Sequence, residues 1–431
     1  MRPKKVLHIT AHMGGGVGKV LSGIASYSEN TKSEYRHEIL LLEMPEKTNF
    51  MDVCRSNHVE VHEIGCERDI FSAIQRADIV QIEWWHHPLM CGWLSNFPSL
   101  PVRLVVWCHV SGCFYPYIPP SFLKIPQMFV FTSEYSLENP YWDEKIRKWA
   151  QKSCAVVNSS GGFEGFVSNK KKNEKKNFVM GYLGTQSYSK MHPDFMDFCQ
   201  KVKDIPGIEF RIIGDKTNER DLAEKARAYG MEKQLRFVDY VNDVKNEFAE
   251  MDVFGYLLNP THFGTTENAL LEAMASALPV VCLNQCAEKY LVQHGKTGLL
   301  VNSIEEYGEA IRYLFHHPEE RFRLGEAARR YVLENFSVEK TVGKLHELYD
   351  SLMAKEKRVH DFRQTFGVTP HEYFFSCLPP TLRQNFSPDK SLPLILREKN
   401  KSSLLHFVRV YPEDKILRDW QEALKHSGVL F

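Results

Sequence analysis

Short apolar runs alternate with amphipathic stretches along most of the chain, a pattern typical of repeated strand–helix units around a parallel sheet. The first half holds seven predicted strands, at residues 6–10, 37–42, 59–64, 78–83, 102–109, 128–132 and 155–159. The second half holds six more, at residues 178–183, 209–213, 235–238, 253–257, 279–283 and 298–301. Each half is too complete to be part of one shared sheet, so we expect two α/β domains.

Helical patterns fill the second half between its strands and after them. They predict helices at residues 194–203, 219–229, 268–277, 304–315, 319–334 and 338–355. The predicted domains are therefore residues 1–168 and residues 178–356, both of Rossmann-like type. Between them, residues 169–177 contain five lysines and no apolar residue. We interpret this stretch as a solvated linker or loop, with a membrane-surface patch as the alternative.

The character of the chain changes after residue 356. Residues 357–431 contain six prolines and short apolar clusters, but no motif that carries chemistry. We expect an extension or a small third domain of unknown role.

Composition excludes several classes of protein. Lys plus Arg and Asp plus Glu both total 54, so no global basic bias indicates a nucleic-acid partner. No apolar run reaches the roughly 18–20 residues of a spanning helix, and residues 6–10 are too short for a signal-peptide core. The ten cysteines are scattered, without CxxC spacing or a His/Cys cluster. We therefore expect no metal site and a cytoplasmic location, with peripheral contact at the inner membrane face as an alternative.

A glycine-rich loop follows the first predicted strand and reads Gly-Gly-Gly-Val-Gly-Lys from residue 14. Glycines let the backbone approach a ligand, and a helix N-terminus favours an anion, so Gly15 and Gly16 are candidate binding residues. A P-loop is excluded because Met13 and Val20 replace its first glycine and its Ser/Thr. Lys19 likewise replaces the last glycine of a G-x-G-x-x-G motif. The alternative is a tight strand–helix turn.

A second candidate segment spans residues 260–281. A helix is predicted to begin near the middle of this segment, with Thr265 or Thr266 as its N-cap and Glu267 in its first turn. Such an N-terminus offers amides and a positive dipole end to a diphosphate. Glu272 lies deeper, among apolar residues, where ribose hydroxyls would supply the partners that a buried acid needs. A capped core helix with an exposed Glu272 is the alternative, and spacing alone does not decide between them.

This segment resembles the donor-site signature of the retaining glycosyltransferases of family 4, which have the GT-B fold with two Rossmann-like domains facing a cleft. The family pattern P-S-x-x-E-G-F-G-x-x-x-x-E-A-M-A-x-G-x-P-V-V aligns without gaps from Pro260. Glu272-Ala-Met-Ala matches it, Pro279-Val-Val closes it, and residues 294–301 match the later D-G-x-T-G-L-L-V. The resemblance covers most of residues 178–355. It is weaker before residue 160 and absent after residue 356.

The resemblance implies a role for individual residues. Glu272 would hold the ribose of the donor, Lys190 would neutralise the diphosphate, and Tyr240 would lie against the base. His109, at a predicted strand end, would lie near the donor sugar, and His109, Lys190 and Glu267 are the catalytic candidates. The remaining donor-binding candidates are Gly15, Gly16, Thr185, Gly264, Thr265 and Thr266. Glu83, Trp84 and His86 end another predicted strand and are candidate acceptor-binding residues, with a packed loop as the alternative.

The sequence departs from the family pattern at four positions. Gly264 stands where the family has its first donor-site glutamate, and Thr185 stands where it has an arginine. Cys286 and Ala287 replace its twin glycines. Glu267 is the candidate replacement for the missing acid.

The implied activity is transfer of a sugar, with retention, from a nucleoside-diphosphate sugar to a glycan or lipid-linked saccharide acceptor. The resemblance implies a part in surface polysaccharide or glycoconjugate synthesis, and no metal or other cofactor. Because of the departures, a second hypothesis is a degenerate fold that binds a nucleotide sugar or a partner without turnover. A nucleotide-sugar epimerase is a third, less favoured because the specific matches are to transferases.

Overall fold

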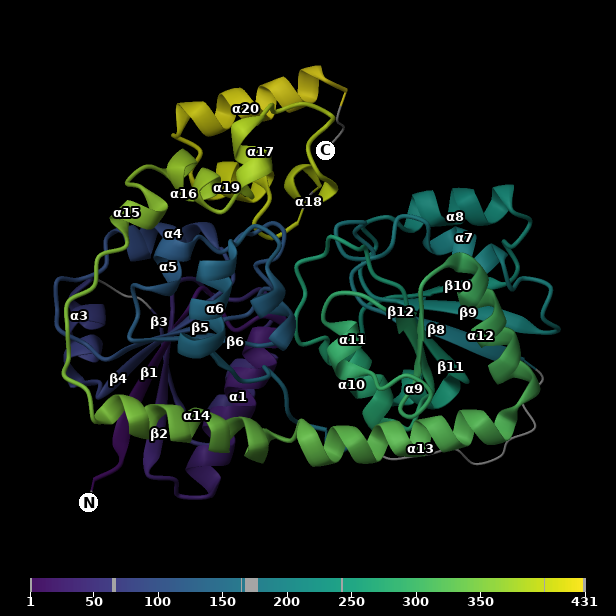
Figure 1. Ribbon diagram of the computed structural model, residues 1–431, viewed down its shortest axis with the longest axis horizontal. Coiled ribbons are helices and arrows are strands. Elements are labelled where there is room, and N and C mark those ends of the chain that lie inside the picture. The colour runs from purple at the N-terminus through teal and green to yellow at the C-terminus, as the bar shows by residue number, and fades with distance from the viewer. Residues whose placement is uncertain are drawn as a thin grey trace. The chain divides into compact units, whose positions relative to one another are not determined.

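The computed structural model divides the chain into two compact units (Figure 1). It describes residues 2–63, 67–163, 165–166, 177–241, 243–398 and 400–428. Unit 1 comprises Met1–Gly162, Phe263–Thr266 and Val338–Phe431, and unit 2 comprises Phe163–His262 and Glu267–Ser337. This division differs from the predicted boundaries at residues 168 and 356. Of the predicted linker, residues 169–176 lie outside the described residues.

Within the described residues, unit 1 is built on one parallel sheet of seven strands in the order β3-β2-β1-β4-β5-β6-β7. Its strands are β1 (Lys4–Thr10), β2 (Tyr35–Leu41), β3 (Glu60–Glu63), β4 (Ile79–Trp84), β5 (Leu104–Cys108), β6 (Met128–Phe131) and β7 (Ala155–Val156). Residues 6–10 of β1 and all of β4 are buried. Such unbroken burial is typical of central parallel strands covered on both faces.

Helices before the unit boundary cover this sheet. They are α1 (Gly15–Asn30), α2 (Asn49–Ser56), α3 (Glu67–Arg76), α4 (Pro88–Ser95), α5 (Pro120–Leu123), the 3₁₀ helix η1 (Glu134–Glu138) and α6 (Glu144–Ser153). The later helix α14 (Val338–Met353) packs against α1 and adds Val342, Leu345, Tyr349 and Leu352 to the core of unit 1. The hydroxyl of Tyr349 donates to Oε1 of Gln81 in β4, 2.7 Å away. Helix α14 therefore belongs to the first unit, although the sequence pattern placed it in the second.

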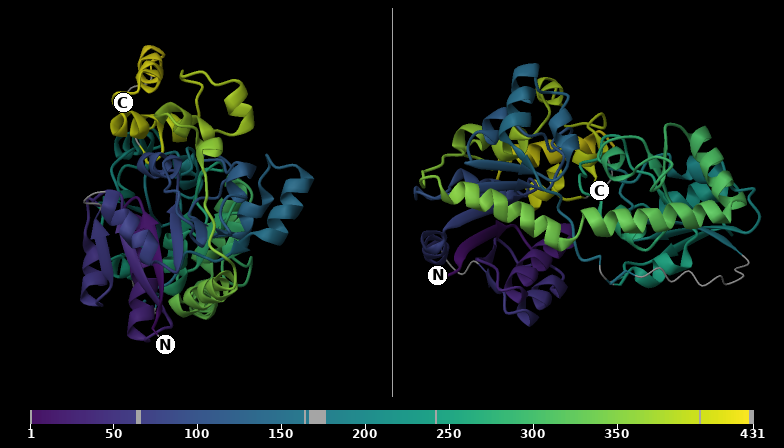
Figure 2. Two further views of the ribbon diagram at one scale, coloured as in Figure 1. Left: turned by 90° about the vertical axis from the view of Figure 1, so that its left-hand side faces the viewer. Right: turned by 60° about the horizontal axis from the view of Figure 1, so that its bottom comes forward.

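The chain after α14 continues along unit 1. Val102 and Arg358 form an antiparallel bridge, and the short tail helices follow. These are α15 (Arg363–Phe366), α16 (Pro370–Ser376), α17 (Pro380–Gln384), α18 (Leu394–Arg397), α19 (Leu404–Val410) and α20 (Lys415–His426). Their buried side chains, including Phe374 and Phe407, share one core cluster with β4 and β5, and Figure 2 shows the tail against unit 1. The tail is thus a part of unit 1 and not a third domain.

Unit 2 repeats the architecture with six described parallel strands in the order β10-β9-β8-β11-β12-β13. The strands are β8 (Phe178–Leu183), β9 (Ile208–Ile213), β10 (Leu235–Val238), β11 (Val253–Tyr256), β12 (Val280–Leu283) and β13 (Leu299–Val301). The helices are α7 (Phe195–Gln200), α8 (Glu219–Ala228), α9 (Lys245–Glu250), α10 (Asn268–Ala275), α11 (Glu288–Leu291), α12 (Ile304–His316) and α13 (Pro318–Asn335). The predicted α/β class with two Rossmann-like halves is confirmed.

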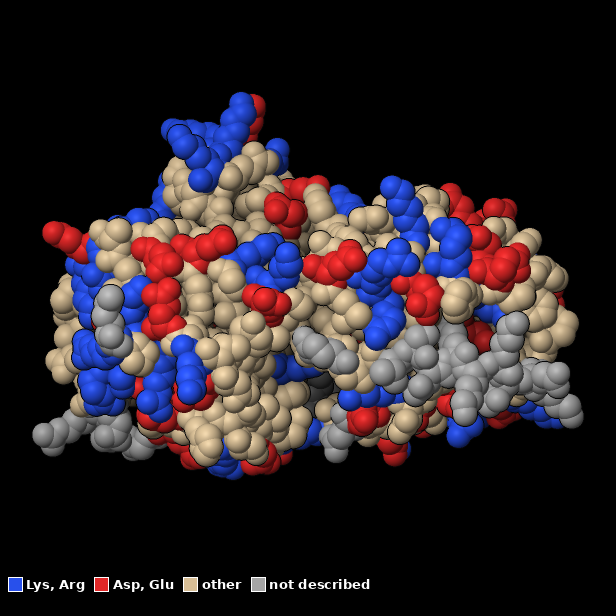
Figure 3. All heavy atoms as spheres, turned by 90° about the horizontal axis from the view of Figure 1, so that it is seen from below, with Lys and Arg blue, Asp and Glu red and all other residues tan. Residues whose placement is uncertain are grey.

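The surface carries charges of both signs. On the face in Figure 3, basic and acidic side chains are interspersed, in keeping with equal totals of 54 each. Within the described ranges, none of the helices combines the length and the apolar character that a membrane crossing requires.

Candidate functional site

The first group of predicted residues lies where the strand order of unit 2 reverses, at β8 and β11. Ligands of such sheets bind beyond the carboxyl ends of the strands at this point. Lys190 follows β8 and Glu267 follows β11, and Nζ of Lys190 lies 3.0 Å from Oε2 of Glu267. The structure therefore joins two predicted catalytic residues in one ion pair.

The Glu267 carboxylate is buried and well supplied with partners. Its side chain is 2% exposed, and Oε2 also accepts a hydrogen bond of 2.6 Å from the hydroxyl of Tyr256. Burial raises the pKa of Glu267, but the charges of Lys190 and His262 and the hydrogen bonds outweigh it, so the pKa is lowered. Glu267 is therefore ionised at neutral pH. Lys190 is less buried, with 22% of its side chain exposed, and its ammonium has three hydrogens to donate.

Two further ionisable residues, His262 and Glu288, complete this group. Nε2 of His262 lies 3.2 Å from Oε2 of Glu288, and its Nδ1 lies 3.8 Å from Oε1 of Glu267. Burial lowers the pKa of His262, but the charges of Glu288 and Glu267 outweigh it and raise the pKa to about 10. The ring is therefore protonated at neutral pH, and a metal held by the neighbouring His262, Cys286 and Glu288 would have to displace that proton. The pairing joins residues 26 apart, which no sequence pattern indicated.

The other donor-side candidates of unit 2 have different surroundings. Glu272, in α10, is only 9% exposed, so the alternative of an exposed Glu272 is not observed. Tyr240, two residues after β10, is 54% exposed and presents a ring at the surface. Thr185 lies in the loop after β8, where its carbonyl accepts a hydrogen bond from the hydroxyl of Tyr182.

The predicted threonine cap of α10 is wrong. The helix begins at Asn268 with Glu267 at the N-cap, and no side chain caps it. Phe263–Thr266, which includes Gly264, belongs instead to unit 1. There the hydroxyls of Thr265 and Thr132 form a hydrogen bond with each other, and the hydroxyl of Thr266 donates a hydrogen bond of 2.9 Å to the carbonyl oxygen of Thr132. The threonine side chains are therefore engaged by partners more than 100 residues away, which local spacing does not reveal.

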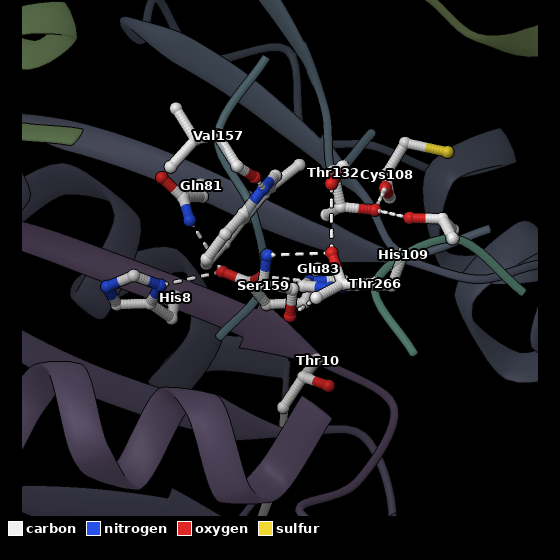
Figure 4. A network of polar contacts seen from close by, with 12 residues as sticks. His8, Thr10, Gln81, Glu83, Cys108, His109, Thr132, Val157, Ser159 and Thr266 are labelled. Atoms are coloured by element: carbon white, nitrogen blue, oxygen red, sulfur yellow. Dashed lines mark hydrogen bonds and ion pairs between the residues drawn. The ribbon is translucent and has the colours of Figure 1, made fainter. Parts of the chain in front are cut away.

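In unit 1, His109 follows β5 as predicted and is held by a buried acid (Figure 4). Its Nε2 lies 2.6 Å from Oε2 of Glu83, and its Nδ1 lies 3.1 Å from Oγ of Ser159. Oε1 of Glu83 contacts Nδ1 of His8 at 2.7 Å and Nε2 of Gln81 at 2.8 Å. Burial raises the pKa of Glu83, but the hydrogen bonds of His109 and His8 outweigh it and lower the pKa to about 2. An ionised Glu83 thus fixes the orientation of His109.

The predicted acceptor-binding surface at the end of β4 is wrong. Glu83, Trp84 and His86 are each 0% exposed. Trp84 packs edge-on against Phe122, and Nε2 of His86 lies 3.0 Å from the carbonyl oxygen of Tyr373 in α16. The packed-loop alternative holds because the tail covers this strand end.

The glycine-rich loop leaves its amides accessible. Gly15 and Gly16 are exposed, and α1 begins at Gly15 without a side-chain cap and without an acid in its first turn. A Cβ at Gly18 would lie 1.9 Å from the carbonyl oxygen of Met13, so the last glycine is required for the tight turn. The loop is therefore both a close turn and an uncapped helix N-terminus.

The middle of the chain matches the sequence profile of a known family. The profile is that of "Glycosyl transferases group 1", and it matches residues 165–331. The matched region, less than half of the chain, is thus similar to this family of glycosyltransferases. This region contains Lys190, Glu267, His262 and Glu288, the four residues of the ionic group in unit 2.

The chain is also similar to several bacterial glycosyltransferases. The capsular polysaccharide biosynthesis glycosyltransferase CapM of Staphylococcus aureus is 26% identical over 212 residues, which cover 46% of this chain and 55% of that protein. The lipopolysaccharide core biosynthesis glycosyltransferase LpsE of Rhizobium meliloti is 26% identical over 147 residues, covering 34% of this chain and 42% of that protein. An uncharacterized glycosyltransferase of Haemophilus influenzae is 29% identical over 144 residues, covering 32% and 39%. Each alignment spans less than two thirds of the relative.

Solved structures extend the likeness to both units. Anabaena HepE in complex with UDP and glucose superposes with a TM-score of 0.65 at 16% identity, covering 81% of this chain and 100% of that one. The pneumococcal O-GlcNAc transferase GtfA, in complex with UDP and GlcNAc, superposes with a TM-score of 0.61 at 10% identity, covering 82% and 100%. The fold is therefore that of the GT-B glycosyltransferases.

Proposed function

We propose that this protein transfers a glycosyl group from a nucleoside-diphosphate sugar to a glycan or lipid-linked saccharide acceptor, with retention and without a metal. The observation that carries the proposal is the Lys190–Glu267 ion pair at the strand-order reversal of unit 2, inside the region that matches the group 1 profile. The bacterial relatives named for capsule and lipopolysaccharide core synthesis support a part in surface polysaccharide or glycoconjugate synthesis.

Lys190 would stabilise the departing diphosphate. An ammonium has three donors, and the contact with Glu267 uses one of them, which leaves two for phosphate oxygens. Glu267 holds the lysine in place, while the neighbouring His262 and Glu288 balance one another. Cations fixed in advance where negative charge develops lower the barrier of such a reaction.

In the proposed reaction, the bond between the anomeric carbon and the diphosphate oxygen breaks. The acceptor oxygen bonds the same carbon on the same face, and its proton passes to the departing diphosphate. His109, fixed by Glu83, would contact the donor sugar, and Glu272 would accept hydrogen bonds from the ribose. We assign no residue as a catalytic base.

The test is release of nucleoside diphosphate by the purified protein from UDP-, GDP-, ADP- and TDP-sugars, with and without a lipid-linked glycan extract. UDP-sugars come first because HepE and GtfA were solved with UDP. We expect release from one donor that depends on the extract, and loss of donor binding in Glu272→Ala. Release that Glu272→Ala leaves unchanged would contradict the assigned site.

A protein that binds a nucleotide sugar without turnover is the second candidate. Thr185, in place of the family's arginine, and the engagement of Lys190 by Glu267 favour it. Thermal stabilisation by one nucleotide sugar, together with no release under any acceptor condition, would support this candidate and overturn transfer.

A further inference from the structure

Three buried histidines lie together where the tail packs against unit 1. His12 follows β1, His87 precedes α4, and His406 lies in α19. They are 9%, 1% and 6% exposed, respectively. The ring centroids of His12 and His87 are 5.8 Å apart, and those of His87 and His406 are 4.7 Å apart. Neither the family resemblance nor the proposed reaction uses this cluster.

Each of the three rings has the same tautomer. Every Nδ1 accepts a backbone N–H, and the distances to Gly14, Leu89 and Ser402 are 2.9, 3.2 and 3.0 Å. A backbone N–H only donates, so each Nδ1 lacks a hydrogen and each Nε2 carries one. Burial, with nearby positive charge, lowers the pKa of His12 and of His406 to about 3, so both are neutral donors.

Two of these three Nε2–H groups lack an acceptor in the described part of the chain. Nε2 of His87 lies 3.1 Å from Oε1 of Glu43, which accepts its hydrogen. Nε2 of His406 has no hydrogen-bond partner there. Nε2 of His12 lies 3.4 Å from Nζ of Lys401, and an ammonium cannot accept a hydrogen bond. The Nε2–H group of His12 and the ammonium of Lys401, two donors from different segments, therefore face each other. An oxygen atom that accepted a hydrogen bond from each would satisfy both.

A divalent metal is the competing occupant, because the ligand atoms of His12, Glu43 and His87 lie within 4.8 Å of one another. A neutral histidine binds a metal through one nitrogen while the other carries the hydrogen. Here the backbone amides occupy Nδ1, so the hydrogen is on Nε2 and blocks its lone pair. The ammonium of Lys401 also repels a cation. The carboxylate of Glu43 is paired with His87. The two groups that remain, Nε2–H of His12 and the ammonium of Lys401, are both donors that fit an anion better than a metal.

We propose that His12 and Lys401 form a subsite for an anionic oxygen group, a phosphate or a carboxylate, on the acceptor. Assignment of this anion to the acceptor rests on the proposed function, whereas the anion site itself does not. Lys401 lies over the ring of Trp85, 5.2 Å from its centroid, which holds the ammonium above the strand end. The uncapped N-terminus of α1 begins three residues after His12 and favours the same charge. The tail thus supplies half of an acceptor subsite.

Histidine side-chain ¹⁵N spectra of the full-length protein test this subsite without any nucleotide sugar. The probes are inorganic phosphate, methyl glucuronide as the carboxylate, and methyl glucoside as the neutral control. We expect His12 to show the Nε2–H tautomer and to shift saturably with one of the two anions but not with methyl glucoside. The effective anion distinguishes a phosphorylated acceptor from an acidic sugar.

The matched variants are Lys401→Ala and Lys415→Ala, two exposed lysines of the tail. Lys401→Ala should weaken anion binding at least ten-fold, while Lys415→Ala should leave it unchanged. No saturable shift with either anion, or equal affinity in Lys401→Ala, would overturn the subsite. A His12 Nδ1–H tautomer with binding of Zn²⁺ would replace it by a metal site. Because the experiment contains no nucleotide sugar, it measures anion binding whether or not the protein transfers a sugar.

Discussion

Lys190 acts within a group of alternating charges and not as an isolated cation. Its ammonium contacts Glu267, whose other oxygen faces His262, which in turn contacts Glu288. Two basic and two acidic groups thus balance in a place where a single unpaired charge would be costly. The ammonium of Lys190 is thus held at the strand ends of unit 2, and the buried Glu267 does not bear the free-energy cost of an unpaired charge.

Lys190→Ala should lower turnover at least ten-fold, because the departing diphosphate loses a fixed cation. A ten-fold change corresponds to about 1.4 kcal/mol of transition-state stabilisation. The measurement is diphosphate release at saturating donor. Lys201→Ala is the control, since Lys201 also forms an ion pair, 3.6 Å from Glu305, but at the surface. Equal turnover of the two variants would refute the role of Lys190.

His262 should make the stability of unit 2 depend on alkaline pH. Its pKa is raised from 6.5 to about 10 in the folded protein. Its contribution is therefore complete below about pH 6.5 and lost as the pH rises through 10. We expect the unfolding midpoint in urea to fall over this range by more in the wild type than in the double variant His262→Gln/Glu288→Gln, which keeps a neutral hydrogen-bonding pair. Parallel pH profiles of the two proteins would contradict the assignment.

The sequence predicted the positions of the candidate site residues better than their partners. His109 was placed by a strand end and a family pattern, and it lies there. Its partner Glu83 was instead assigned to an acceptor surface, since nothing local shows that residues 26 apart share a hydrogen bond of 2.6 Å. The Thr265 and Thr266 cap failed for the same reason, because the competing partner, Thr132, is more than 100 residues away in the sequence.

At the scale of elements, every predicted strand overlaps an observed one. Central strands such as β4 were predictable because parallel strands buried on both faces are continuous apolar runs, whereas the edge strand β3 is not buried. The helix α14 was placed in the wrong unit, since its amphipathic pattern shows that one face is buried but not against which sheet.

Strand ends are constrained as tightly as strand cores. A Cβ at Gly214, which follows β9, would lie 2.0 Å from the carbonyl oxygen of Gly184, which follows β8.

Gly214→Ala should therefore destabilise unit 2, by about 1–3 kcal/mol from overpacking, with backbone strain in addition. All seven tryptophans lie outside unit 2, so far-UV circular dichroism should show the change while tryptophan fluorescence keeps its wild-type midpoint. Gly230→Ala is the control for a positive φ without the close contact, because its φ is +69° (against +154° at Gly214) and a Cβ would meet nothing within 4 Å. A Gly214→Ala midpoint equal to that of Gly230→Ala would show that the close contact is not limiting.

At the scale of the molecule, the tail completes unit 1. The sequence pattern predicted an extension of unknown role, because prolines divide most of it into short helices, and the one longer amphipathic helix, α20, was not recognised. The aromatic side chains of these helices enter the core of the first sheet instead of forming their own. The tail also covers the end of β4 through the contact of His86 with Tyr373, and supplies Lys401 beside His12. Stability and the proposed acceptor subsite of unit 1 therefore depend on the same 75 or so residues at the chain end.

Phe374→Ala tests this dependence with a single substitution. The ring is 0% exposed, and its centroid lies 5.4 Å from that of Phe407 and 5.9 Å from that of Trp420. Truncating such a side chain costs about 3–5 kcal/mol, because it removes buried area and leaves a cavity. All seven tryptophans belong to unit 1, so the urea midpoint of tryptophan fluorescence should fall.

The matched control for that experiment is Phe322→Ala in unit 2, where the ring is 60% exposed and its loss should change stability by less than about 0.5 kcal/mol. If the tail were an independent third domain, Phe374→Ala would melt the tail alone. The six tryptophans before residue 150 would then report an unchanged transition, and only the signal of Trp420 would be lost early. A single transition shifted as a whole instead requires that the tail and the first sheet unfold together, since a shared core makes them one cooperative unit.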